Sequence, residues 1–347
     1  MKNNRLLYLL IIILTIWCAI LSSQVRHANA PEPAKVVNQY TVSGFSTDLT
    51  KIYDGNKAGI VTINADGNIL SGFVYRQEEG TVYIVSAYHG LVDTRNISVR
   101  FGSSYSVQGN LLAYDIFTDL AIISIETPYD IAGLRLGDAS LLKPGEFLLA
   151  IGTPVSSDYD GSAELCIVSK NNFQIENMIE DDGNRQNYFL NVIELGSSLQ
   201  NGYSGSPLMN MGGEVVGMVT MSAQDSVSFA ITANEIRAVA DKLISLEEIT
   251  RHNFGVKGTF LNDMYNYEKA NLNISLDTID GFYVERVMEG SMAYEAGVRN
   301  GDVITMINNN QIIDPDTYFE AMYADAETFN FTYIRDGQAV LGSPSDD

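Results

Sequence analysis

The chain has 347 residues, of which 46% are hydrophobic and 18% charged, a composition typical of globular proteins with buried cores. Its formal net charge at pH 7 is −22, and no Asp or Glu occurs among the first 30 residues, so the remainder is more acidic still. Such a charge disfavours a phosphate-binding surface, and we expect no nucleic-acid partner. Cys18 and Cys166 are the two cysteines, so we expect no internal disulfide, no Cys/His zinc site and no cofactor.

The first predicted element is an apolar segment at the amino end. Lys2 and Arg5 precede an apolar run over residues 6–21, which reaches residue 25 if Ser22 and Ser23 are included. This length lies between the core of a signal peptide and a membrane span.

A membrane anchor and a cleaved signal peptide both fit this segment. The residues Ala28-Asn29-Ala30 have the small-x-small form of a cleavage site, but Pro31 follows directly and fits poorly. We expect residues 1–25 to be an anchor that crosses the cytoplasmic membrane through residues 6–25, with the rest exported to the periplasm or cell surface. A cleaved signal stays open, and residues 26–45 are expected to be a linker.

Residues 46–248 are predicted to form a β-rich domain. Short apolar runs alternate with turn signals such as residues 64–67, a spacing typical of antiparallel barrels or sandwiches. The expected strands cover residues 58–63, 69–75, 81–87, 111–114, 121–125, 146–151, 215–221 and 227–231. A helical periodicity over residues 232–246 predicts the helix that closes this domain.

A second domain is predicted over residues 252–342. Its expected strands cover residues 281–284, 302–307 and 329–334, and a short helix is expected around residues 292–296. Asp314 and Pro315 have the residue types of an N-cap and a first helical position, so they predict a helix that continues through Met322.

Three residues in the order His, Asp and Ser could together cut an acyl bond. A serine hydroxyl becomes a nucleophile when an imidazole takes its proton, and the imidazole needs a carboxylate to fix its tautomer. The chain has three histidines; His27 lies beside the apolar segment and His252 lies far beyond the candidate serine, which leaves His89. Asp119 and Ser204 complete the set, although each residue alone is also compatible with an ordinary turn.

The surroundings of these residues resemble the HtrA (DegP/DegS-like) family of trypsin-like serine proteases. Residues 84–93, 118–125 and 201–208 are similar to the family's histidine, aspartate and serine motifs. Three further segments resemble scaffold motifs of the family, namely residues 150–154, 213–218 and 228–231. The resemblance implies a mostly β fold, with a protease domain of two six-stranded barrels followed by an α+β PDZ domain.

The resemblance also implies roles for individual residues. His89 would be the base, Asp119 would orient it, and Ser204 would be the nucleophile. The backbone amides of Gly202, Tyr203 and Ser204 would form the oxyanion hole. Tyr203 stands where the family has Asn, and Ser206 replaces a Gly. Both differences bear on the conformation of the loop around Ser204.

The C-terminal domain resembles the PDZ domain attached to HtrA proteases. Asn253, Phe254, Gly255 and Val256 match its carboxylate-binding loop, which holds a peptide C-terminus while the peptide adds as a strand. The groove would also involve the helix at residues 314–322, where Tyr318 or Met322 is either a groove wall or simple core packing.

Two functions from different classes follow. The first is an exported serine endopeptidase of protein quality control or stress signalling, which cuts unfolded or mislocalised proteins. PDZ capture of C-terminal peptides would regulate this protease or recruit its substrates. The second is a catalytically impaired PDZ sensor or scaffold. The resemblance further implies a homotrimer. An esterase is excluded because residues 202–206 lack the final Gly of its motif and because that fold places His after Ser.

Overall fold

The computed structural model describes residues 14, 17, 43–181, 184–223, 227–278 and 280–344. The predicted amino-terminal hydrophobic helix therefore lies outside the described residues, except for Leu14 and Trp17, as does the linker up to residue 42. Within the described ranges, no helix combines the length and the apolar character that a membrane crossing needs. The chain divides into two compact units, residues 1–46 and 47–347, and the second contains the elements that form the site.

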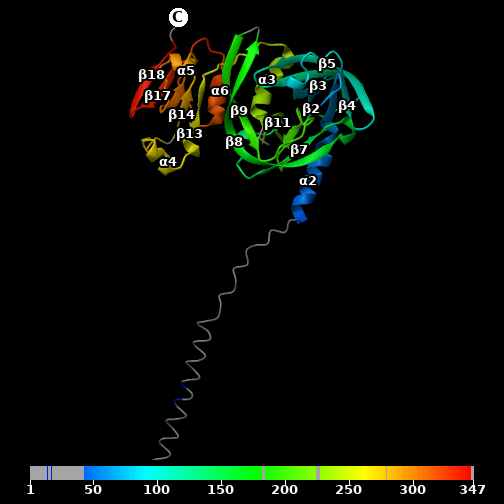
Figure 1. Cartoon of the computed structure of the whole chain (residues 1–347), viewed down its shortest axis with the longest axis horizontal. Helices are drawn as coiled ribbons and strands as arrows, with labels where there is room; N and C mark the ends of the chain where they lie inside the picture. Colours follow the sequence, from blue (N-terminus) through cyan, green and yellow to red (C-terminus); the bar gives the residue numbers. More distant parts are fainter. Residues whose placement is uncertain are drawn as a thin grey trace, which may run out of the picture. The chain divides into compact units, whose positions relative to one another are not determined.

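The first closed barrel has six antiparallel strands in the order β1-β2-β3-β6-β5-β4. Strands β2, β3, β4 and β5 of this barrel are labelled in Figure 1. Alternating side chains such as Val61, Ile63 and Ile84 are fully buried inside it, as period-two apolar patterning requires. Its strands are β1 (Ile60–Ala65), β2 (Asn68–Glu78), β3 (Thr81–Ala87), β4 (Ile97–Phe101), β5 (Tyr105–Asp115) and β6 (Leu120–Glu126).

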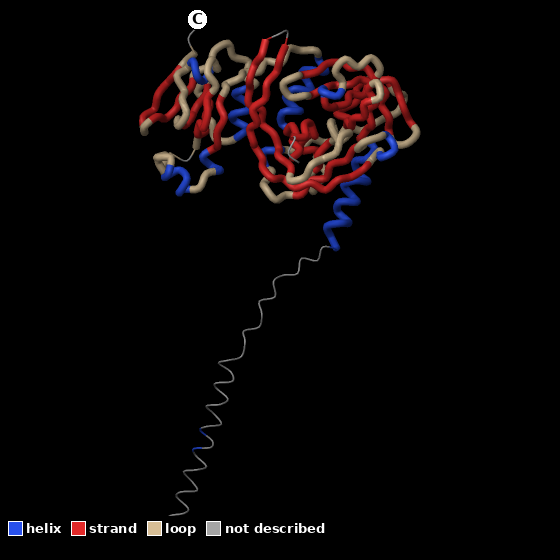
Figure 2. Tube along the Cα trace, in the orientation of Figure 1, coloured by secondary structure: helices blue, strands red, loops and turns tan. Residues whose placement is uncertain are grey.

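The second closed barrel also has six strands, in the order β10-β11-β12-β9-β8-β7. Its strands are β7 (Phe147–Gly152), β8 (Ser162–Asp181), β9 (Asn184–Leu195), β10 (Pro207–Met209), β11 (Val215–Ala223) and β12 (Val227–Thr232). Figure 2 shows β8 and β9 as two long adjacent strands. Helix α3 (Ala233–Ser245) follows, with the Thr232 side chain accepting from the Glu235 amide at its start.

The C-terminal domain is a six-stranded antiparallel sheet with β13 at one edge. Its strands are β13 (Val256–Phe260), β14 (Phe282–Val287), β15 (Val303–Ile307), β16 (Asn310–Gln311), β17 (Phe331–Arg335) and β18 (Gln338–Gly342). Its helices are α4 (Asn266–Asn271), α5 (Met292–Glu295) and α6 (Pro315–Met322). The Asp314 side chain accepts from the Thr317 amide, so the predicted N-cap is confirmed.

The predicted architecture of two six-stranded barrels and an α+β domain is confirmed. The predicted helix over residues 232–246 corresponds to α3. Helix α2 (Ser43–Asn56) is absent from the predicted elements; its Leu49, Ile52 and Tyr53 pack against the barrel core. Strands β8 and β9 are also absent from the predicted elements; in β8, residues 170–177 are mostly polar and have the composition of a loop.

Candidate active site

His89 and Asp119 lie at the same end of the first barrel because β3 and β6 pair with Ala87 opposite Leu120. His89 lies in the short 3₁₀ helix η2 (Tyr88–Gly90) after β3, and Asp119 directly precedes β6. One carboxylate oxygen of Asp119 lies 2.6 Å from the Nδ1 atom of His89, and the other accepts the His89 backbone N–H, also at 2.6 Å. Asp119 therefore fixes both the ring and the main chain of His89.

The bond to Asp119 sets the chemistry of the imidazole. It raises the pKa of His89 above its ordinary value of 6.5, and burial opposes the shift. With Nδ1 facing a carboxylate, the neutral ring carries its proton there, which leaves Nε2 as the proton acceptor. The Thr220 hydroxyl also donates to Asp119, an additional contact that sequence reasoning had missed.

Ser204 lies on the same cleft as this pair. The cleft has a volume of about 450 Å³ and is lined by His89, Asp119 and Ser204. The Ser204 hydroxyl donates to the Thr220 carbonyl oxygen at 3.4 Å, and among the described residues it has no hydrogen bond to His89. The structure thus brings the three predicted side chains to one cavity, where the hydrogen bond between Ser204 and His89 is not formed.

Ser71 on β2 bonds the loop at residues 202–204 to the first barrel. Its backbone N–H donates to the Ser204 carbonyl at 2.9 Å, and its hydroxyl donates to the Gly202 carbonyl at 2.7 Å. The same hydroxyl oxygen accepts the Thr153 N–H at 2.8 Å. Ser71 is fully buried, so these bonds position the loop from a partner 131 residues away in sequence, and no local motif pointed to it.

The three amides predicted for the oxyanion hole are not equivalent. The Tyr203 N–H donates to the Gln200 carbonyl at 3.2 Å, and the Tyr203 side chain is buried, which raises the pKa of Tyr203 to about 12. The Gly202 and Ser204 amides have no hydrogen-bond acceptor among the described residues. Two donors of the three are therefore available to a developing negative charge.

The predicted carboxylate-binding loop is held by its own side chains. The Asn253 side chain accepts the Gly255 N–H at 3.0 Å and donates to the Asn187 carbonyl at 3.0 Å. Phe254 is buried, with its ring packed edge-on against Phe329, and Val256 begins β13.

The free edge of β13 faces a side chain of the protease domain. Gln174 on β8 accepts the Gly258 N–H at 2.9 Å and donates to the Val256 carbonyl at 3.4 Å. A cavity of about 50 Å³ lies here, and Tyr318 and Met322 line it. Both residues also pack on the core of this domain, and burial raises the pKa of Tyr318. Tyr318 and Met322 therefore line this cavity and also belong to the packing of the core, and their role as a groove wall stays a prediction.

The remaining histidine and cysteine within the described ranges have structural surroundings. The His252 ring bonds to the Ala324 carbonyl at 3.0 Å and packs on Phe329. Cys166 is a buried free thiol. Across these ranges, no group of three or more His, Cys, Asp or Glu side chains could hold a metal ion.

Family models match two parts of the chain, a trypsin-like peptidase domain over residues 70–218 and a PDZ domain over residues 283–335. The chain is 27% identical over 319 residues to the serine protease Do-like HtrA of Lactococcus lactis subsp. lactis (strain IL1403), covering 88% of this chain and 77% of that protein. It is also 27% identical over 279 residues to the protein of the same name from Bacillus subtilis (strain 168), covering 78% and 61%.

Two solved structures share the fold. The HtrA-type protease AlgW with tripeptide superposes with a TM-score of 0.59 at 20% identity, covering 85% of this chain and 95% of that one. The same protease with decapeptide gives a TM-score of 0.54 at 17% identity, covering 86% and 99%. At these identities the likeness concerns the arrangement of the barrels and the PDZ domain.

Proposed function

The chain belongs to the HtrA-type trypsin-like serine proteases, and we propose that it cuts peptide bonds with Ser204 as nucleophile, His89 as base and Asp119 as orienting carboxylate. The Ser204 oxygen attacks the carbonyl carbon while His89 Nε2 takes its proton. Asp119 stabilises the imidazolium that forms, and the Gly202 and Ser204 amides stabilise the oxyanion. His89 then gives the proton to the leaving amine, and water hydrolyses the acyl-enzyme with His89 acting again.

One observation carries this proposal. The His89–Asp119 pair at 2.6 Å shares a cleft with Ser204, next to two backbone amides that are free of acceptors among the described residues. The proposed substrates are unfolded or mislocalised proteins in quality control or stress signalling. The peptide-bound AlgW structures support peptides as ligands. Trimeric assembly stays a prediction of the resemblance.

Export is part of the proposal and rests on the apolar run at residues 6–25, which lies outside the described residues apart from Leu14 and Trp17. We propose an extracytoplasmic protease domain, anchored in the cytoplasmic membrane through that run. A signal peptide cleaved after Ala30 is the alternative, and it would leave the mature chain without the anchor.

Labelling of the full chain in intact cells with a membrane-impermeant fluorophosphonate probe tests activity and location together. We expect label on the wild-type protein, no label on Ser204→Ala, and retention of the labelled protein in membranes after carbonate extraction. Ser206→Ala is the matched control, because its buried hydroxyl has no hydrogen-bond partner among the described residues and its loss should leave the label unchanged.

A second candidate function is supported by the contact between the Ser204 hydroxyl and the Thr220 carbonyl, in place of one with His89. In that case the chain is a PDZ sensor or scaffold without turnover. Absence of label from the purified chain, even with an added C-terminal peptide, would favour the sensor. Label on intact cells only after permeabilisation would contradict export but not catalysis.

PDZ capture is proposed to occur at the free edge of β13. A bound peptide would add as a strand there and use the Val256 carbonyl and the Gly258 amide, which Gln174 now occupies. Gln174→Ala is therefore expected to tighten binding of a peptide with a free C-terminus by about 5- to 30-fold, since Gln174 makes two hydrogen bonds to this edge and each contributes about 1 kcal/mol.

Fluorescence polarisation with a labelled peptide measures this effect, and the C-terminally amidated peptide shows how much binding depends on the carboxylate. Leu165→Ala on the same strand is the control, because its side chain is 40% exposed and is not among the residues that line the two cavities beside Asn253. Unchanged or weaker binding by Gln174→Ala would place the peptide elsewhere.

A further inference from the structure

The turn before Asp119 is organised by a buried carboxylate. Asp115, at the end of β5, accepts the Thr118 N–H at 3.2 Å and the Thr118 hydroxyl at 2.6 Å. It also accepts the Phe117 N–H at 3.4 Å. Asp119 itself has φ of 57°, a left-handed conformation that costs a non-glycine residue about 1–3 kcal/mol. The surrounding bonds must therefore hold this backbone in place.

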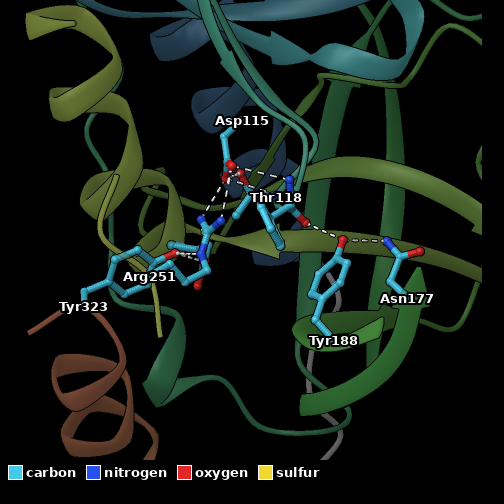
Figure 3. Close-up of polar contacts among 8 residues, drawn as sticks. Asp115, Thr118, Asn177, Tyr188, Arg251 and Tyr323 are labelled. Atoms are coloured by element: carbon cyan, nitrogen blue, oxygen red, sulfur yellow. Dashed lines mark hydrogen bonds and ion pairs between the residues drawn. The ribbon is translucent and has the colours of Figure 1, made fainter. Parts of the chain in front are cut away.

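Arg251 binds the Asp115 carboxylate from a position 136 residues further along the chain. Its Nη1 and Nη2 atoms donate to the two oxygens of Asp115 at 3.2 and 2.7 Å (Figure 3). The guanidinium also lies over the Phe117 ring, 5.2 Å from its centroid. Arg251 lies between α3 and β13, in the segment that joins the two domains. This segment therefore directly contacts the turn at residues 115–118, called the catalytic turn below.

The pair is buried and charged. The side chains of Arg251 and Asp115 are 12% and 7% exposed. Burial opposes ionisation of Asp115, but the hydrogen bonds and charge of Arg251 outweigh it and lower the pKa of Asp115. Removing Arg251 would leave the buried Asp115 carboxylate without this countercharge, so the conformation of the turn depends on the bond.

The far side of the guanidinium reaches the PDZ domain and α3. Arg251 Nε donates to the Tyr323 hydroxyl oxygen at 2.8 Å, and the Tyr323 hydroxyl donates to Glu235 on α3. Tyr323 lies at the end of α6. One side chain thus connects the catalytic turn with the C-terminal domain (Figure 3).

The opposite side of the turn is held by the β8–β9 hairpin. The Tyr188 hydroxyl donates to the Phe117 carbonyl at 2.7 Å, and the Asn177 side chain donates to the Tyr188 hydroxyl at 2.8 Å (Figure 3). Tyr188 and Asn177 thus fix only the Phe117 carbonyl. Of the contacts that reach this turn from Arg251, Tyr188 and Asn177, only those of Arg251 hold the Asp115 carboxylate.

We propose that Arg251 is a positioning residue for the Asp119–His89 pair, which it holds by clamping Asp115 at the start of the turn. If the clamp is lost, Asp119 relaxes from its left-handed conformation and its carboxylate moves away from His89. A displacement of about 1 Å at such a group costs up to about 100-fold in rate. The inference rests on the proposed catalytic roles of His89, Asp119 and Ser204.

The test compares kcat, KM and the pH profile of the full chain on an amidated peptide substrate. We expect Arg251→Lys and Asp115→Asn each to lower kcat by about 10- to 100-fold with KM changed by less than about 2-fold. The pKa of the acid limb in the pH profile of kcat/KM should also fall toward 6.5, because His89 loses part of its bond to Asp119. A purely structural role would lower the melting temperature and leave this limb in place.

Arg286→Met is the matched control. Arg286 donates to Glu176 on β8 at 2.7 Å, so its loss removes another link between the two domains without touching the turn. It should leave kcat and the pH profile unchanged. The inference is overturned if folded Arg251→Lys and Asp115→Asn both keep the wild-type pH profile, or if Arg286→Met shifts it equally. Wild-type protein that takes up no fluorophosphonate would overturn the proposed function, and this inference with it.

Discussion

Asp119→Asn should lower kcat by about 10⁴-fold while the melting temperature changes by only a few degrees. The Asp119 carboxylate accepts the His89 backbone N–H, the His89 ring and the Thr220 hydroxyl. Asn replaces one acceptor oxygen by an NH₂ group, which would face a donor. The ring then takes the tautomer with Nδ1 unprotonated, and Nε2 can no longer accept the Ser204 proton. Steady-state kinetics with an active-site titration measure the loss.

The pH dependence gives the same variant a second readout. His89 must be neutral to act as a base, so wild-type kcat/KM should rise through a pKa above 6.5. Asp119→Asn should move this limb down to 6.5 or lower, since the hydrogen bond to Asp119 is the main cause of the shift. The raised pKa also stabilises the folded state below the unfolded pKa, and this contribution is lost as pH rises through the folded pKa.

Asp93→Asn is the control for that change, because Asp93 is exposed and lies four residues after His89. It should retain wild-type kcat and pH profile. If Asp119→Asn kept kcat within about 10-fold, another carboxylate would have to orient His89, and the assignment of Asp119 would be wrong.

The candidate residues of the triad could be identified from the sequence because histidine is scarce and because each residue lies in a local motif. The barrels were predictable from short apolar runs bounded by turn signals, as in β1 and β6, whose side chains are almost all buried. Local patterns of this kind are formed by residues close together in sequence. They carry no information about which distant segment packs on them.

The supporting contacts could not be predicted for that reason. Ser71 bonds to a carbonyl 131 residues away, and Arg251 bonds to a carboxylate 136 residues away. Gln174 lies in a polar stretch that reads as a loop, yet it pairs with the edge of β13. In each case an ordinary polar residue gains its role from tertiary packing.

Gly202→Ala should reduce kcat by about 10²- to 10³-fold, the usual loss for one oxyanion donor. Gly202 has φ of 98°, and an added Cβ would lie 2.2 Å from the Thr153 carbonyl oxygen and 2.9 Å from the Val155 amide. These neighbours are backbone atoms, so the Gly202 peptide must move instead and its amide leaves the site. KM should change little, because the amide acts on the transition state more than on bound substrate.

Gly67→Ala separates backbone strain from the local contact. Gly67 has the same φ of 98°, but an added Cβ there would meet nothing within 4 Å. Both variants should therefore share the cost of a left-handed alanine, about 1 kcal/mol in stability, while only Gly202→Ala loses activity. Stopped-flow acylation with an activated ester would locate the loss in the step that forms the oxyanion. If Gly202→Ala acylated at the wild-type rate, the Ser204 amide would be sufficient and Gly202 would serve only to shape the turn.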